Sequence, residues 1–431
     1  MTATAPGRVD GARVAVVQRR TLVVVVTAQL LGGLGLAAGV SVGVLIARQL
    51  LDSALLSGVP AAAGTAGGAV AAIGLSRVMA RGGRRPGLVA GYLLGALGSA
   101  GVVVATQVES FLLLCVAMAV FGSGNVASLL ARYTGADLAP ARSRGRALSL
   151  VLFATTFGAV AGPNLVGPTR AVADSLGLPS LTGPFLLSGV AYLLAAAVLA
   201  ALLRPDPLLL ARDRARVDGA ATVPSPTGAP VTHDPAGSWA AVIQGRAALG
   251  LLAIVVAQFV MGLMMTMTPV HMADHGHGLG VIGFVIGAHI AGMYAFSPLA
   301  GWLTDRVGRV ATIVSGAGAL AAAGVLGGLA DPDARAALTV ALFLLGLGWS
   351  LALVAGSTLL TDSVPLELRA KAQGNADLVV GASATVAGAG SGVVLDLGGW
   401  ATIATVTSAA AVVMSVAVLG RHCRCAPRRR S

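Results

Sequence analysis

Long apolar stretches alternate with short polar gaps along almost the whole chain. There are about twelve such stretches, each of 18 to 26 residues, and a helix needs roughly 20 apolar residues to cross a bilayer. No charged side chain falls clearly in the middle of a stretch. The pattern therefore predicts twelve transmembrane helices. They are expected at residues 21–46, 54–76, 87–106, 110–131, 147–169, 181–203, 247–270, 279–303, 311–330, 336–359, 378–395 and 399–420.

The basic residues lie almost entirely in alternate gaps between these stretches. Of the 29 Lys and Arg residues, only Arg48, Arg170 and Arg335 fall in the other set of gaps. Basic residues collect on the cytoplasmic side of membrane proteins. An even number of spans places both termini on that same side, so we expect both to be cytoplasmic. Every basic residue except Lys371 is Arg, which is typical of a GC-rich bacterial genome and predicts a bacterial cell (inner) membrane.

Composition excludes two other classes of protein. Hydrophobic residues make up 56% of the chain and charged residues 11%, whereas soluble domains carry about 25% charged residues. A soluble protein of this composition would expose large apolar patches, so membrane lipid is the expected neighbour. The net charge of +12 does not indicate nucleic-acid binding, because the basic residues are dispersed among loops with little aromatic interleaving.

The longest gap divides the predicted spans into two sets of six. Its first part, from residue 204, has the pattern of a short amphipathic helix, and its second part is a Pro/Gly/Ser linker with no core to bury. We therefore predict three regions. They are an N-terminal six-helix bundle at 1–203, a cytoplasmic loop at 204–246, and a C-terminal six-helix bundle with a basic cytoplasmic tail at 247–431.

The two sets of spans also repeat in sequence. One shift of 225 residues aligns charged residues in two separate loops of each half. Two homologous bundles in parallel repeat are an architecture of secondary transporters. The aligned pairs are Arg81 with Arg306, Gly83 with Gly308, Arg84 with Arg309, Asp137 with Asp362, Pro140 with Pro365, Arg144 with Arg369, and Arg146 with Lys371.

The loop after the eighth span carries a recognisable motif. Residues 301–309 read GWLTDRVGR, which resembles the G-x-L-x-D-R-x-G-R signature of the major facilitator superfamily. The resemblance implies an all-α transporter with a cytoplasmic gate formed by this loop. Asp305 would pair with a basic group or a neighbouring helix N-terminus, and such a contact would hold the two bundles together. The residues of this predicted gate are Gly301, Asp305, Arg306, Gly308 and Arg309.

The matching loop of the first half departs from that signature. It keeps Arg81, Gly83 and Arg84, but Ser76 replaces the first Gly and Ala80 replaces the Asp. We therefore expect the contact between the bundles to depend on the second half alone. The alternative for the loop after the eighth span is a role in membrane topology only.

The fifth span contains Gly158, Gly162 and Pro163. Their spacing is similar to the G-x-x-x-G-P element of proton-coupled drug exporters of the superfamily. Small residues at this spacing also permit ordinary close packing of helices, so that alternative stays open. Two other marks of such exporters, an acidic residue in the first span and an Arg before Gly122, are absent.

Polar side chains inside the predicted spans are candidates for a substrate cavity. In the superfamily the first, fourth, seventh and tenth spans line the central cavity, and here they contain Gln29, Asn125, Gln258 and Trp349. A polar side chain that faces lipid is unfavourable, so these residues should face inward. Trp349 and Tyr294 are suited to stacking on an aromatic or cationic solute. For each amide, hydrogen bonding between helices is the alternative.

His289 is the candidate for proton coupling. It lies ten residues into the eighth span, roughly 15 Å deep, whereas no carboxylate lies clearly in the middle of a span. Histidine is the side chain that normally titrates near neutrality. A neutral histidine, hydrogen-bonded inside the bundle, is the alternative.

The loop after the seventh span is rich in histidine. It contains His271, Asp274, His275 and His277, which are residue types that bind zinc or copper. The spacing matches no strong metal motif, so a solvated loop is the preferred interpretation. We predict no metal site and no cofactor.

These features together predict a transporter. Its partners would be protons and a small-molecule substrate, and its activity would be proton-coupled export of small amphipathic drugs or metabolites by alternating access. Uptake of a nutrient or organic ion is the alternative within the same fold, and a transport-inactive membrane sensor is an alternative from another class. No nucleophile–base pair or nucleotide-binding loop is present in the sequence, so we do not expect an enzyme.

Overall fold

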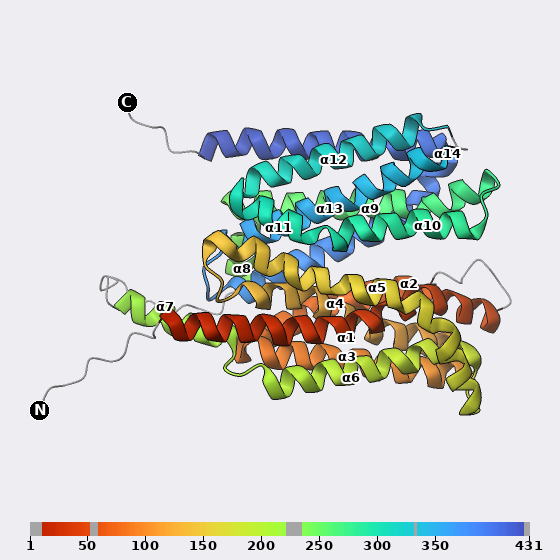
Figure 1. The fold of residues 1–431 in the computed structure, drawn as a ribbon, viewed down its shortest axis with the longest axis horizontal. Coiled ribbons are helices and arrows are strands. Elements are labelled where there is room, and N and C mark those ends of the chain that lie inside the picture. The colour runs from red at the N-terminus through yellow and green to blue at the C-terminus, as the bar shows by residue number, and fades with distance from the viewer. Residues whose placement is uncertain (1–10, 52–58, 221–234, 332–333, 426–431) are drawn as a thin grey trace, which may run out of the picture.

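The computed structural model describes residues 11–51, 59–220, 235–331 and 334–425. In these ranges the long helices run alongside one another in two groups, which lie one above the other in Figure 1. The first half of the chain forms one group and the second half forms the other. We call these groups the first and second bundles.

The helices of each bundle follow one another in chain order. The first bundle contains α1 (Gly11–Leu51), α2 (Val59–Gly82), α3 (Arg84–Gln107), α4 (Phe111–Ala136), α5 (Arg144–Ser175) and α6 (Gly183–Leu202). The second contains α9 (Gly245–Asp274), α10 (Leu279–Ile290), α11 (Ser297–Arg306), α12 (Arg309–Leu329), α13 (Arg335–Ser363) and α14 (Arg369–Cys425). Between the bundles in sequence lie α7 (Pro207–Ala220) and α8 (Pro235–Ile243). Single turns are η1 (Ala141–Ser143), η2 (Ser180–Thr182) and the π-helical η3 (Ala291–Ala295).

The described helices supply twelve spans. Ten segments are long and apolar enough to cross a membrane, and the last of them covers most of α14. Within α14, Gly399 has a φ of 66° that interrupts the helix, so the two parts of α14 count as separate spans. The fifth span is α5, which packs along α1 as the first part of α14 packs along α9. The predicted all-α fold with twelve transmembrane helices is therefore confirmed.

Each bundle has its own buried core. One cluster of buried apolar residues runs from Val24 to Leu208 and includes only Ala370 from the second half. The other runs from Leu249 to Val418 and includes only Leu152 from the first half. Since lipid is as apolar as these side chains, close fit between small and large residues must hold the helices together.

Glycine provides that fit in the first bundle. A Cβ atom added to Gly35 of α1 or to Gly124 of α4 would lie within 2.8 Å of the ring of Tyr192. A Cβ atom at Gly32 would meet the ring of Tyr92 in the same way. The two tyrosine rings are fully buried between helices, so the missing glycine side chains create the space that the rings fill.

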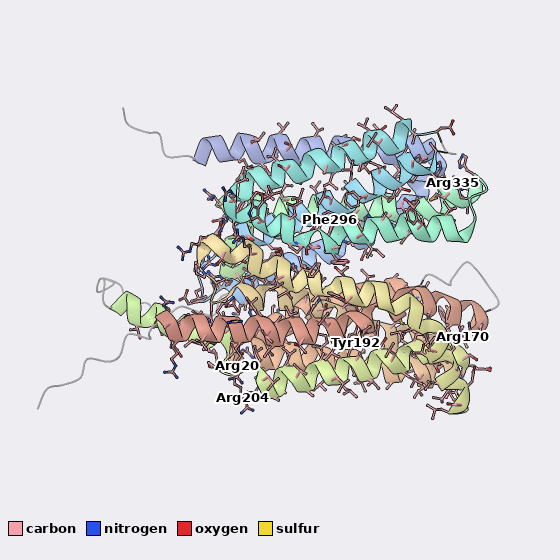
Figure 2. The ribbon with its side chains drawn as sticks, in the orientation of Figure 1. Arg20, Arg170, Tyr192, Arg204, Phe296 and Arg335 are labelled. Atoms are coloured by element: carbon pink, nitrogen blue, oxygen red, sulfur yellow. The ribbon has the colours of Figure 1, made fainter. Side chains whose placement is uncertain are left out.

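The outer surface of the bundles is apolar along its length and basic at one end. Leu112 and Val413 are among many large apolar side chains that are more than half exposed, which suits a lipid environment and not water. Arg20 and Arg204 lie at one end of the molecule, and Arg170 and Arg335 lie at the other, as Figure 2 shows. We call the first of these ends, where α1 begins and α14 finishes, the arginine-rich end.

The central connection contains more structure than the sequence predicts. A helix is present in the first part of the connection, where a short amphipathic helix was expected from residue 204, and it is α7. However, part of the predicted linker forms α8, in which Val242 and Ser238 are buried. The side-chain amide of Asn375 donates to the Ser238 hydroxyl over 3.2 Å, so α8 is fastened to α14. The rest of the predicted linker, residues 221–234, lies outside the described residues.

Candidate functional site

Asp305 joins the two bundles at the arginine-rich end. It lies near the end of α11 in the second bundle, and its carboxylate accepts hydrogen bonds of 2.9 Å from the backbone N–H groups of Gly145 and Arg146. These two residues lie in the first turn of α5 in the first bundle. A helix N-terminus carries unsatisfied N–H groups and a partial positive charge, so a carboxylate there is well placed.

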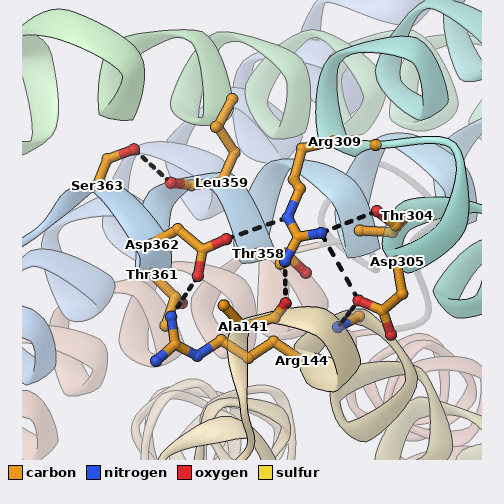
Figure 3. A network of polar contacts seen from close by, with 12 residues as sticks. Ala141, Arg144, Thr304, Asp305, Arg309, Thr358, Leu359, Thr361, Asp362 and Ser363 are labelled. Atoms are coloured by element: carbon orange, nitrogen blue, oxygen red, sulfur yellow. Dashed lines mark hydrogen bonds and ion pairs between the residues drawn. The ribbon is translucent and has the colours of Figure 1, made fainter.

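Arg309 extends this contact into a network (Figure 3). Its Nε donates to Asp362 over 3.1 Å, and Arg144 of the first bundle pairs with the other oxygen of the same carboxylate. Arg309 also donates to the backbone carbonyls of Thr304 and Ala141. Asp362 is therefore shared between an arginine of each bundle.

The first half contributes an equivalent contact through Arg84. This fully buried arginine donates to both oxygens of Asp137, over 2.7 and 3.0 Å. Arg84 and Asp137 are the counterparts of Arg309 and Asp362 under the 225-residue shift. Arg84 also donates to Gln373 of α14 over 2.6 Å. The expectation that the contact depends on the second half alone is therefore wrong.

The connecting helix α7 occupies the position where the first-half loop lacks an acidic residue. Arg212 of α7 donates to the carbonyl of Ala80 over 2.7 Å and to that of Glu367, in the second half, over 3.2 Å. Asp206, just before α7, accepts a 2.8 Å hydrogen bond from the backbone N–H of Arg85 at the start of α3. Arg212 thus bridges both bundles at the loop where Ala80 replaces the acid, and Asp206 fastens the segment to the first bundle.

Glycines of the two loops permit tight turns between helices. Gly83 and Gly308 have φ values of +90° and +108°, which residues with a side chain rarely adopt. Each glycine is followed directly by the arginine that begins the next helix. Arg81 is exposed, and the guanidinium of Arg306 lies 5.7 Å from the ring centroid of Trp302. Neither of these two arginines makes a described bond to the other bundle.

Two Gly–Ser pairs, each with one residue from either half, bring the bundles into close contact. A Cβ atom on Gly301 of α11 would overlap the side chain of Ser149 of α5, and one on Gly374 of α14 would overlap that of Ser76 of α2. The shift of 225 residues converts Ser76 into Gly301 and Ser149 into Gly374. The two contacts are thus equivalent, with glycine and serine exchanged. Ser76 is accommodated in place of the expected glycine because its partner is Gly374.

A cavity of about 190 Å³ lies between the bundles. Its walls come from α2 and α4 of the first bundle and from α9, α13 and α14 of the second. Asn125, Gln258 and Trp349 line it, and the Trp349 indole N–H donates to Gln258 over 2.9 Å. These three predicted cavity residues are therefore brought together, whereas α2 and α14 line the cavity in place of α1 among the described residues.

The two charged residues of the lining are Arg132 and Asp377. Arg132 of α4 and Asp377 of α14 form an ion pair of 2.6 Å, and their side chains are 1% and 5% exposed. Arg132 lies four residues before the end of α4, or about 6 Å along the helix, and Asp377 lies about 12 Å after the start of α14. The pair therefore closes the cavity towards the arginine-rich end and connects the two bundles.

The remaining predicted cavity residues lie outside the lining. Gln29 is buried in the first bundle, where its amide donates to Ser128 and Thr155. Tyr294 packs edge-on against Trp349, with ring centroids 5.8 Å apart. Gln29 thus makes the interhelical hydrogen bonds given above as the alternative, and Tyr294 supports the aromatic wall from behind.

His289 is buried between α10 and α13. Its Nδ1 lies 2.9 Å from the carbonyl of Leu342, and its Nε2 is buried without a hydrogen-bond partner among the described residues. It does not line the cavity, but the π-helical turn η3 begins two residues later and carries Tyr294. A π-helical turn inside a helix frequently marks a functional position.

The fifth-span motif lies along α5. A Cβ atom on Gly158 would overlap the backbone of Gly33, so α1 and α5 are in backbone contact there. Gly162 and Pro163 are within the same helix, and their surroundings lie outside the described part of the structure. The close packing expected of the motif is therefore present at Gly158.

The histidine-rich loop is more buried than predicted. His271 and His277 are buried, whereas Asp274 and His275 are exposed. The ring of His271 stacks on that of Trp400 with centroids 4.4 Å apart. Among the described residues, no three His, Cys, Asp or Glu side chains are grouped so as to hold a metal ion.

Arg132 is a lining residue that was not predicted from the sequence. The predicted fourth span ended at residue 131, whereas α4 continues to Ala136. The pairing of Arg84 with Asp137 was also missed, although one shift aligns both residues with Arg309 and Asp362. That shared offset was the signal that could have identified the Arg84–Asp137 pair and the Arg309–Asp362 pair.

The comparisons with known proteins agree with this architecture. The sequence profile of the Major Facilitator Superfamily matches residues 25–281 and 249–429. YdeG of Bacillus subtilis (strain 168), described as an uncharacterized MFS-type transporter, is 43% identical over 377 residues, which are 88% of this chain and 86% of YdeG. The riboflavin transporter RfnT of Brucella anthropi is 29% identical over 392 residues, which are 89% of this chain and 91% of RfnT.

Among solved structures, the proton:xylose symporter XylE has the same fold. It superposes with a TM-score of 0.73 at 17% identity, covering 94% of this chain and 96% of XylE. The profile match, the identity to YdeG and the two repeated bundles all lead to one assignment. The chain is a multi-pass membrane transporter of the Major Facilitator Superfamily.

Proposed function

We propose that this protein is a secondary transporter that exports a small amphipathic compound in exchange for protons, by alternating access. The observation that carries the proposal is the cavity between the bundles, which the Arg132–Asp377 pair closes on one side. A site enclosed by two repeated bundles is exposed to one side of the membrane at a time when the bundles rock against each other.

We assign the arginine-rich end to the cytoplasm. Basic residues favour that side of a membrane, and Arg19, Arg20, Arg84 and Arg144 all belong to this end. Both termini are then cytoplasmic, and the closed network of Asp305 and Asp362 forms the inner gate. In this orientation the described state is closed towards the cytoplasm.

The direction of transport is supported by the fifth-span motif. Gly158 allows α1 and α5 to meet at their backbones, and such contacts let helices approach closely and slide. The motif resembles that of proton-coupled exporters, so we propose export. The cavity contains one aromatic wall, two amides and one ion pair, which suits a compound with an apolar and a polar part.

The test is transport by the purified protein in proteoliposomes with an imposed pH gradient. We expect solute to move in the direction opposite to the flow of protons. Collapse of the pH gradient should reduce the uphill flux of solute to the level of empty liposomes. Solute and protons moving in the same direction would contradict export. A screen of cationic, neutral and anionic amphiphiles in which no solute gives proton-linked flux would contradict the function as a whole.

A second candidate is uptake of a flat aromatic solute. RfnT is named a riboflavin transporter, and the edge-on pair of Trp349 and Tyr294 provides an aromatic wall for a planar ring. This candidate predicts that riboflavin enters proteoliposomes together with protons. The same flux measurement therefore separates it from export.

We also propose that His289 takes part in proton coupling. It is a buried titratable group with an unpartnered Nε2, and the turn that follows it carries Tyr294 against the cavity tryptophan. We expect His289→Gln, which cannot bind a proton, to lower the number of protons exchanged per solute. Parallel measurement of proton and solute fluxes tests this, with the exposed His275→Gln as the control. An unchanged ratio would remove His289 from the mechanism.

A further inference from the structure

One oxygen at the floor of the cavity has no partner. Asp377 uses Oδ1 to accept the 2.6 Å bond from Arg132, while its Oδ2 is buried without a hydrogen bond among the described residues. The side chain is only 5% exposed. A buried acceptor that lacks a donor is unfavourable, so this position is suited to a proton or another positive group.

Arg132, the partner of Asp377, has no guanidinium nitrogen without a hydrogen-bond acceptor. Its Nε donates to Ser357 over 3.4 Å, its Nη1 to the carbonyl of Leu129 over 2.6 Å, and its Nη2 to Tyr133 over 2.9 Å as well as to Asp377. Each nitrogen of the guanidinium already has an acceptor. The open position of the pair therefore favours a cation over an anion.

The wall above the pair is aromatic and apolar. Trp349, Leu353 and Ser357 are spaced four residues apart and lie on one face of α13. Trp349 and Leu353 line the cavity, and Ser357 contacts Arg132. The tryptophan thus lies two turns, or about 12 Å, from the level of the ion pair. An occupant that contacts both Trp349 and the ion pair has an aromatic ring joined by a short chain to a positive group.

The pair also connects elements that must separate during transport. Arg132 lies on α4 and Asp377 on α14, so opening the arginine-rich end pulls the two charges apart. Arg132 then keeps three neutral acceptors, in Ser357, the carbonyl of Leu129 and Tyr133, whereas a charged Asp377 is left buried without its partner, which is strongly unfavourable. A proton on Asp377 removes its charge, and a bound cation replaces the arginine as its partner. The unloaded carrier is therefore held closed, and only the loaded forms can change conformation.

We propose that Asp377 is the site at which a proton and the positive group of an arylalkyl cation bind alternately. This inference rests on the proposed function and adds the substrate class and the exchange site to it. The titratable and charged groups that face Asp377 are Arg132 and Tyr133 of α4, with Arg84 of α3 further away. The residues of α2, α9 and α13 that line the cavity carry no titratable side chain.

Equilibrium binding of a cation with a fixed charge tests the proposal. Radiolabelled 4-phenylbutyltrimethylammonium is dialysed against the purified full-length protein at several pH values from 5.5 to 8.5. For the wild type we expect the Kd to increase as the pH falls, by up to tenfold per unit where Asp377 takes up its proton. For Asp377→Asn we expect a Kd that does not change with pH and is at least tenfold higher than the wild-type Kd at pH 8.5.

Three controls make the result specific. Asp377→Glu retains a carboxylate and should keep the pH dependence, and Asp396→Asn, which alters an exposed acid on the same helix, should bind as the wild type does. The anion 4-phenylbutanesulfonate should not compete. Size-exclusion profiles and thermal unfolding establish that each variant is folded.

The proposal is overturned if the wild type does not bind the cation, if Asp377→Asn binds it with wild-type affinity, or if the sulfonate competes equally well. Proteoliposome flux separates this failure from failure of the proposed function. Proton-coupled flux of a neutral or anionic solute that is unaffected by Asp377→Asn would leave the transporter proposal intact and remove the cation site. Loss of cation–proton exchange in Asp377→Asn, with exchange retained in Asp396→Asn, is the expected result.

Discussion

Replacing Asp137 with Asn is expected to lower the free energy of unfolding by about 3–5 kcal/mol, which is the typical effect of removing one member of a buried ion pair. Arg84 and Asp137 are both fully buried and share two hydrogen bonds. The neutral amide leaves the Arg84 charge uncompensated, since Gln373 supplies only one neutral acceptor. Thermal unfolding of the purified protein in detergent micelles measures the effect.

A double-mutant cycle separates the pair from its surroundings. The combined variant Asp137→Asn/Arg84→Gln removes the unpaired charge, so we expect it to recover part of the loss of the single variant. The control is Asp213→Asn in α7, whose carboxylate is 4.0 Å from Arg216 with both side chains largely exposed. Exposed pairs contribute about 0–1 kcal/mol. Equal destabilisation by Asp137→Asn and by the control Asp213→Asn would contradict a buried ion pair at Asp137.

The fold could be predicted because lipid imposes a simple rule on the sequence. Spans must be apolar and about 20 residues long, and the predicted stretches fall in described helices. The eighth is divided among α10, η3 and α11, and the last two are the two parts of α14. The predicted ends were less accurate, because helices continue beyond the hydrocarbon core. The extra turn of α4 contains Arg132, so a boundary error of a few residues removed a charged group from the predicted cavity.

The candidate site was predictable only where it follows the repeat or the polarity of the spans. Asn125, Gln258 and Trp349 could be identified because polar or amphipathic side chains inside an apolar stretch should face a cavity. Gln29 meets the same criterion, but Ser128 and Thr155 satisfy its amide within the bundle. Only the packing of α1 against α4 and α5 distinguishes these cases, and a single sequence does not reveal it.

The connecting segment was the least predictable part of the gate. Asp206 and Arg212 are individually ordinary charged residues of a polar loop. Their contacts to Arg85, Ala80 and Glu367 depend on the position of α7 beside both bundles. A loop motif that lacks its acid therefore does not imply a missing gate, because side chains distant in sequence can supply the bonds.

Gly374→Ser is expected to prevent full closure of the arginine-rich end. Its new Cβ atom would overlap the Ser76 side chain and lie 2.9 Å from the carbonyl of Ala72. Overpacking of this kind costs about 1–3 kcal/mol, which shifts a two-state equilibrium by roughly 5- to 150-fold. Hydrogen–deuterium exchange of residues 72–84 measures the result, since amides at an open end exchange faster. Gly318→Ala, at a helical position with no neighbour within 4 Å, is the matched control.

The repeat supplies a rescue variant for the same experiment. Ser76→Gly combined with Gly374→Ser exchanges the two residues and reproduces the arrangement already present at Gly301 and Ser149. We therefore expect the double variant to recover most of the protection lost in Gly374→Ser. Exchange in Gly374→Ser as slow as in the Gly318→Ala control would show that closure does not require the glycine. If Ser76→Gly does not restore protection, the overlap with Ser76 is not the cause of the faster exchange in Gly374→Ser. The two variants together therefore test the contact between positions 76 and 374, and not only the size of the residue at position 374.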